Sequence, residues 1–113
     1  MQLLFIILKK TEMVDILMRE LANAGVHGGT VLESTGMVKS LSTGPEGIPI
    51  INAISAMLNG TTPTANSTTI LLALPEERLE IAKEVVHKTI GDLSKPNAGV
   101  MFALPITFSE GIN

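Results

Sequence analysis

The 113-residue sequence contains no cysteine, no tryptophan and no tyrosine, and only three phenylalanines. Without cysteine there are no disulfides, no thiolate metal ligands and no cysteine nucleophile. The chain has 8 Lys and Arg against 11 Asp and Glu, a formal net charge of -3, and it lacks the basic clusters that neutralise a phosphate backbone. We therefore expect no nucleic-acid partner, and we expect one domain over residues 1–113.

A membrane-spanning segment is not expected either. No charged residue lies between Glu46 and Glu76, but prolines and a polar run interrupt this stretch, so it lacks the roughly 20 consecutive apolar residues of a spanning helix. The apolar run 3–8 is too short for the core of a signal peptide, and we expect a cytoplasmic protein. Composition leaves one oddity, because 45% hydrophobic and only 17% charged residues make the chain unusually apolar for a small monomer.

Apolar runs and amphipathic stretches predict an α+β fold. Thr11 is expected to cap the first helix and Gly25 to end it, and Pro75 is expected at the first position of the second helix. Strands are predicted over 3–8, 30–35, 69–74 and 100 to about 108, and helices over about 12–24 and 75–90. This order predicts a ferredoxin-like βαββαβ sandwich, with four strands and two helices on one face.

The strands are apolar at consecutive positions, and this bears on assembly. Two helices cover only one face of such a sheet, yet residues 3–8, 70–74 and 100–104 would place apolar side chains on both faces. The second face needs a cover, and we expect a homo-oligomer whose sheets meet face to face. The alternative is that the segment between strands two and three folds back over its own sheet.

That segment is a long insert at about residues 37–67, too long for a simple hairpin connection. A short amphipathic helix is predicted within it, because apolar residues recur at helical spacing. These residues are Ile50, Ala53, Ile54, Met57 and Leu58. The helix could dock into a groove of a partner, or its apolar stripe could pack on the domain or on a neighbouring subunit.

Candidates for catalysis or metal binding are few. His27 has no second histidine or acid spaced to join it, and we interpret it as an exposed loop residue. Glu33 is the only acid in a predicted strand, and it could hold a ligand or pair with Lys39. Asp92 follows Gly91 and is expected to organise a turn. No Ser-His-Asp, HExxH or phosphate-cradling motif is present, so we expect a protein that is not an enzyme and holds no metal.

Several short motifs occur in an order and spacing that one family shares. They are the run 3–8 ending in Lys9-Lys10, then Ala24-Gly25-Val26, Gly29-Thr30-Val31 and Glu33-Ser34-Thr35-Gly36-Met37. With these motifs the chain resembles the nitrogen-regulatory PII signal proteins, and more closely their PII-like relatives. The resemblance implies a homotrimer of ferredoxin-like subunits that binds small effectors, usually adenine nucleotides, in clefts between subunits. It also implies that the long loop contacts a regulated enzyme or transporter.

The resemblance also suggests which residues would hold a ligand. Gly29 and Thr30 match the cleft segment that meets the base, Gly36 matches the glycine at the base of the effector loop, and Lys39 falls near the phosphates. The loop 95–99, which contains Asn97, stands where the family has its second phosphate-binding loop. Together with Glu33, the candidate ligand-binding residues are Gly29, Thr30, Glu33, Gly36, Lys39 and Asn97.

The chain departs from the family pattern where phosphates would bind. The loop 95–99 has no lysine aligned with the phosphate contact, Val38 stands where a second glycine is usual, and the final strand has no arginine. These departures do not favour nucleotide binding in the usual mode, because a buried charge without partners is costly. The absence of tyrosine also removes the acceptor for uridylylation.

Two hypotheses follow from the sequence. The first is an atypical PII-like regulator that senses a small effector, an adenine nucleotide being one candidate, and acts through its long loop on a partner. The second is a ligand-free assembly subunit, a trimeric interaction module. The copper-tolerance protein CutA has the same architecture, but this chain lacks cysteine and the aromatic residues typical of that family.

Overall fold

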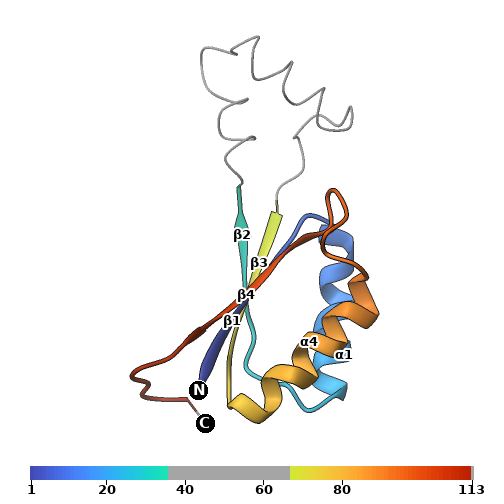
Figure 1. Ribbon diagram of the computed structural model, residues 1–113. Coiled ribbons are helices and arrows are strands. Elements are labelled where there is room, and N and C mark those ends of the chain that lie inside the picture. Colours follow the sequence, from blue (N-terminus) through green and yellow to red (C-terminus); the bar gives the residue numbers. More distant parts are fainter. Residues whose placement is uncertain (36–66, 113) are drawn as a thin grey trace, which may run out of the picture.

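The computed structural model describes residues 1–35 and 67–112, which form a four-stranded antiparallel sheet and two helices (Figure 1). The elements in chain order are β1 (Gln2–Leu8), the 3-10 turn η1 (Thr11–Met13), α1 (Val14–Asn23), β2 (Thr30–Ser34), β3 (Ser67–Leu74), α4 (Glu76–Ile90) and β4 (Gly99–Pro105). The predicted α+β class is confirmed, and the arrangement is compatible with a ferredoxin-like sandwich. Within the described ranges, no helix combines the length and apolar character needed to cross a bilayer.

Some expectations fall on residues that the structure does not describe. The predicted amphipathic helix at 50–58 lies outside the described residues, as do the candidate ligand-binding residues Gly36 and Lys39. The alternative cover for the sheet, an insert folded back over it, lies there too.

β1 and β3 are the two central strands of the sheet, whose strand order is β2-β3-β1-β4. Ile6 pairs with Ile70 of β3 on one side and with Met101 of β4 on the other. Burial alternates along β1 and β3, as expected where one face of a sheet packs on a core. Both helices lie on the same side of the sheet (Figure 1).

The core lies between this face and the helices. From β1 and β3 it takes the side chains at alternate positions, and from the helices it takes one stripe each. The largest fully buried side chains are Leu4, Ile6, Leu8, Leu17, Leu21, Ile70, Leu72, Leu74 and Val86. The buried residues of α1 (Val14, Leu17, Leu21) and of α4 (Ala82, Val86, Ile90) recur at helical spacing in the sequence.

Helix α1 ends in a Schellman motif, as the position of Gly25 predicts. Gly25 has a φ of +86°. This left-handed conformation is unfavourable for residues that have a side chain, and glycine adopts it readily. The Val26 amide donates to the Leu21 carbonyl at 2.9 Å and the Gly25 amide donates to the Ala22 carbonyl at 3.0 Å. Val26 is buried, which adds the apolar contact typical of this motif.

Several predicted boundaries are wrong by one to three residues. β3 begins at Ser67, two residues before its predicted start and inside the predicted insert at about 37–67. Thr11 does not cap a helix with its side chain but begins the turn η1, and α1 starts at Val14. Pro75 is the residue before α4, with an extended ψ of 152°, and not its first helical residue. β4 ends at Pro105 instead of continuing to 108, because Pro105 already pairs with Gln2, the first residue of β1.

Replacing Gly25 with alanine should destabilise the fold by about 1 to 2 kcal/mol, the cost of a left-handed L-residue. The new Cβ would also lie 2.7 Å from a guanidinium nitrogen of Arg78 and displace it. Urea unfolding at one fixed protein concentration measures the loss.

Gly28→Ala is the matched control, since Gly28 has a φ of +83° but a Cβ added there would have no atom within 4 Å. It should cost less than Gly25→Ala, because it disturbs neither the Schellman motif nor Arg78. Equal stability of Gly25→Ala and the unchanged protein would contradict this account of the helix end.

Candidate functional site

The described candidate residues do not form one site within a single chain. Thr30 and Glu33 lie on the edge strand β2, and Asn97 lies in the turn before the opposite edge strand β4. Across the sheet, Glu33 pairs with Thr68, Thr68 with Leu8, and Leu8 with Gly99. Three strand spacings of about 4.8 Å each therefore separate the two edges by roughly 14 Å.

Gly29 has a packing role that the sequence motif did not reveal. A Cβ at this position would lie 2.7 Å from the terminal methyl of Met18 and 3.0 Å from a methyl of Leu72. The glycine therefore lets the segment before β2 pass close to α1 and β3. Thr30 and Glu33 are both exposed, on opposite faces of β2, so either could contact a molecule bound at this edge.

The loop before β4 contains two successive turns. The Ala98 amide donates to the Lys95 carbonyl at 3.3 Å across the turn that contains Asn97, and the turn before it is held by Asp92. One carboxylate oxygen of Asp92 accepts from the Ser94 amide at 2.9 Å and from the Ser94 hydroxyl at 2.6 Å. These bonds lower the pKa of Asp92, the side-chain bond most, and the expected role of Asp92 in the turn is confirmed. Asn97 has a φ of +62°, in the left-handed region. Asparagine tolerates this conformation better than most residues with a side chain, so it suits the turn.

Three exposed lysines belong to this end of the sheet. The Lys9 amide donates to the Ala98 carbonyl at 3.5 Å, which brings the Lys9-Lys10 pair beside the turn that holds Lys95. Within residues 1–35 and 67–112, the one ion pair joins Lys83 to Glu80 at 3.0 Å, so these three lysines have no carboxylate partner there. The sequence of loop 95–99 alone does not reveal this gathering, because Lys9 and Lys10 come from the far end of β1.

The face of the sheet opposite the helices, here called the open face, is largely apolar. Its side chains alternate with the core positions, and cross-strand pairing assigns them to one surface. They are Leu3, Phe5, Ile7, Thr30, Leu32, Ser34, Ser67, Thr69, Leu71, Ala73, Val100, Phe102 and Leu104. In the described part of the chain no helix covers this face, and Phe102 and Leu104 are 42% and 48% exposed.

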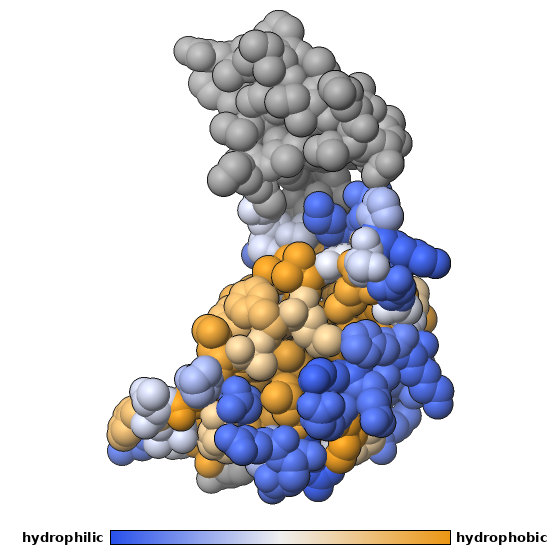
Figure 2. Space-filling model, viewed as in Figure 1, coloured by the Kyte–Doolittle hydropathy of each residue, from blue (hydrophilic) through white to orange (hydrophobic). Residues whose placement is uncertain are grey.

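An aromatic pair lies in the middle of the open face. Phe5 and Phe102 are register partners whose rings stack with centroids 4.9 Å apart and an interplanar angle of 13°. Figure 2 shows hydrophobic surface gathered over the strands and mostly hydrophilic surface over the helices. A patch of this kind on a small domain marks an interaction surface.

Three hydroxyl groups lie on the open face at its insert end, where β2 ends and β3 begins. The Ser34 and Ser67 hydroxyl oxygens are 2.7 Å apart, and the Thr69 hydroxyl donates to the Ser34 hydroxyl at 2.9 Å. Each of the three oxygens takes part in at least one of these two bonds, and one of the three O–H groups keeps a free donor. They join β2 to β3 at the base of the insert.

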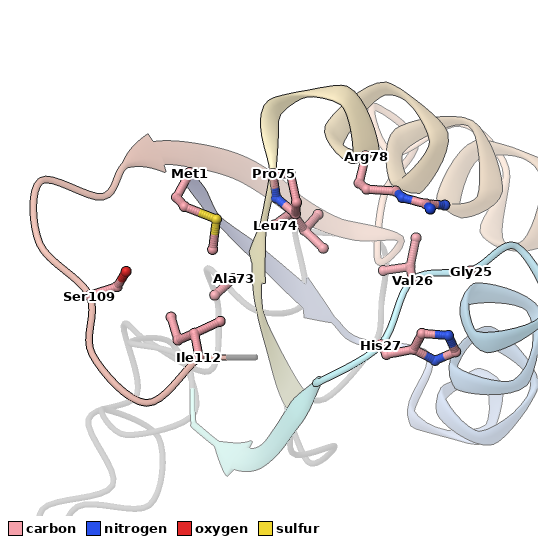
Figure 3. A pocket seen from close by; sticks show the side chains of 10 residues that line it. All are labelled: Met1, Gly25, Val26, His27, Ala73, Leu74, Pro75, Arg78, Ser109 and Ile112. Carbon is pink, nitrogen blue, oxygen red and sulfur yellow. The ribbon is translucent and has the colours of Figure 1, made fainter.

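A pocket lies at the opposite end of the sheet, where β3 passes into α4 (Figure 3). It has a volume of about 320 Å³. Its walls come from both ends of the chain, from the segment after α1 and from the β3–α4 junction. None of its residues is among the six sequence candidates, and segments so far apart in sequence leave no local motif.

The pocket is lined by Met1, Gly25, Val26, His27, Ala73, Leu74, Pro75, Arg78, Ser109 and Ile112. His27 is exposed, as expected from the sequence. Across the described residues, no three histidine, aspartate or glutamate side chains gather closely enough to hold a metal ion.

Comparisons with known proteins gave no match, either to a protein-family model or to a curated protein. The interpretation of the site therefore rests on its geometry and on the sequence motifs.

The carboxyl group of Asp92 should titrate below the ordinary aspartate pKa of about 3.9. Because the folded pKa is lowered, the folded protein binds fewer protons than the unfolded chain near this pH. The contribution of Asp92 to stability is present above the ordinary value and is lost as the pH falls through the folded pKa. Ser94→Ala removes the largest cause and should raise the pKa of Asp92 toward its ordinary value.

An NMR titration of the side-chain carboxyl carbon measures this pKa in both proteins. Ser109→Ala, a serine in another segment, is the control and should leave the titration of Asp92 unchanged. An identical titration in the Ser94→Ala protein would show that Ser94 does not hold the carboxylate in solution.

Proposed function

We propose that the chain is a PII-like regulatory protein, not an enzyme, that assembles as a homo-oligomer and binds a small anionic effector between copies. In this proposal the fold is a ferredoxin-like βαββαβ sandwich with a long insert, the oligomer is a trimer, and the insert acts on a partner enzyme or transporter in the cytoplasm. The apolar open face is the observation that carries the proposal.

The open face supports self-association for a physical reason. Covering a half-exposed leucine or phenylalanine contributes on the order of 1 kcal/mol, and the face presents a contiguous set of such side chains. Another copy offers the same surface, so sheets that meet about a symmetry axis bury it in a closed assembly. The hydroxyls of Ser34, Ser67 and Thr69 share two hydrogen bonds, so only one of their three O–H donors would need a partner in the buried interface.

The positions of the candidate residues support a cleft between copies. Thr30 and Glu33 lie at one edge of the sheet and Asn97 beside the other, so within one chain these residues are not gathered around one point. Two copies that meet through their sheets can bring the β2 edge of one toward the β4 edge of the next. The candidate residues then flank a single cleft.

Three lysines on the β4 side of this cleft support an anionic effector there, away from the carboxylate of Glu33 on the β2 side. Lys95 begins the turn that holds Asn97, and the Lys9 backbone amide contacts that turn at Ala98. Among the described residues neither lysine, nor Lys10, forms an ion pair, although the Asp92 carboxylate is near enough to interact with Lys95. The three lysines supply cations that the final strand lacks, and a phosphate or carboxylate group would be stabilised beside them. An adenine nucleotide bound through these lysines would therefore use a different set of contacts from the usual family pattern.

The open face also fits the second hypothesis, a ligand-free assembly module. Both functions need the oligomer, and only the regulator needs the lysines beside the turn of Asn97. Ligand binding therefore separates the two functions.

The oligomer is tested by placing a charge on the open face. Light scattering during gel filtration should report an oligomer for the unchanged protein and a monomer for Leu104→Asp, because an unpaired carboxylate would be buried. Ile16→Asp is the matched control, since Ile16 is 44% exposed on α1, away from the open face, and should leave the mass unchanged. A monomeric mass for the unchanged protein would contradict the proposal.

The effector is tested by calorimetry and native mass spectrometry with ATP, ADP, AMP and small carboxylate metabolites. We expect one of these to bind the oligomer, and Lys95→Glu to weaken its affinity about tenfold, the loss of one charge-assisted contact. Lys83→Glu is the control, because Lys83 lies on α4 in an ion pair with Glu80. An oligomer that binds none of them would instead support the assembly module.

A further inference from the structure

The pocket at the β3–α4 junction has chemistry of its own, separate from the cleft proposed above. It shares no residue with the six sequence candidates, and it lies at the end of the sheet away from the insert (Figures 1 and 3). An inference drawn from it therefore does not rest on the proposed function.

The lining of the pocket is asymmetric in charge and polarity. Arg78 is its one arginine or lysine side chain, no aspartate or glutamate lines it, and most of its other walls are apolar. In Figure 3 the side chains of Arg78 and His27 lie on one side of β3, and those of Met1, Ser109 and Ile112 lie on the other. Leu74 and Pro75 lie between these two groups.

The guanidinium of Arg78 is available to a ligand. It makes no ion pair with the described residues, and the residues three and four positions away on either side are all apolar. These residues are Leu74, Pro75, Ile81 and Ala82. The guanidinium lies over Gly25, where the missing side chain leaves room for it.

We propose that this pocket binds an elongated amphiphile with one carboxylate, which pairs with Arg78, and with an apolar body directed toward Met1 and Ile112. The planar fork of a guanidinium pairs with a carboxylate through two parallel hydrogen bonds. Glu76 and Glu77 stand in the same first turn of α4, and their charges oppose a ligand that carries two negative charges. A medium-chain fatty acid has the required chemistry.

Arg78 also has a structural role, which must be distinguished from its proposed role in binding a carboxylate. The last turn of α1 contains no basic residue, and Arg78 lies beside the end of that helix, where a cation is favourable. A purely structural arginine would affect stability without affecting ligand affinity. The experiment therefore measures both quantities.

The test is an NMR titration of the full chain with sodium octanoate below its micelle concentration. We expect saturable shifts at the amides of Gly25, His27 and Leu74, and a roughly tenfold loss of affinity in Arg78→Gln, the effect of removing one charged contact. Arg19→Gln is the matched control, because Arg19 is an exposed arginine on α1 outside the pocket and should bind octanoate unchanged.

Ile112→Asp tests the apolar end and should also weaken octanoate, since Ile112 is 47% exposed and its replacement leaves the core intact. The proposal is overturned if octanoate causes no saturable shifts, or if the shifts map to the open face. It is also overturned if octan-1-ol binds as tightly as octanoate, or if Arg78→Gln lowers only the unfolding temperature. Tighter binding of octyl phosphate than of octanoate would overturn the choice of a carboxylate.

Discussion

The structure depends on one constraint: two helices cover a single face of a four-stranded sheet whose central strands are apolar on both faces. Along β1, Leu4, Ile6 and Leu8 enter the core, while the residues between them reach the open face. The core on the helix side orders the fold. The described residues leave the apolar surface of the open face partly exposed. Burying it would release free energy, and this burial requires a second surface that packs against it.

The sheet also separates two chemically different ends. At the insert end, backbone pairing gathers the hydroxyls of Ser34 and Ser67 and brings Lys9 beside the turn of Asn97. At the other end, the β3–α4 junction places Arg78 over the Gly25 turn. Strands about 20 Å long keep these ends apart, so a ligand at one end does not share contacts with a ligand at the other.

The sequence predicted the elements well because their signals are local. Helical spacing identified the buried stripe of α1, and Gly25 marked its end correctly. The limits of β4 were wrong because a strand ends where its partner ends, and Gln2 lies far away in sequence. The sequence predicted ligand-binding residues less well than it predicted helices and strands. A short motif does not show whether Gly29 makes room for a ligand or for the side chain of Met18. The pocket is assembled from segments that are distant in sequence, so no motif marks it.

Net charge illustrates the same difference between global and local information. A total of -3 does not favour a phosphate backbone as a partner, because such a partner requires many cations along one surface. It does not exclude a small anion, because screening limits the relevant charges to those within about 10 Å of the site. Lys9, Lys10 and Lys95 form one such neighbourhood and Arg78 another. Carboxylates stand near both neighbourhoods, Asp92 near Lys95 and Glu76 and Glu77 near Arg78, so the balance of charge at each place depends on the local arrangement and not on the total.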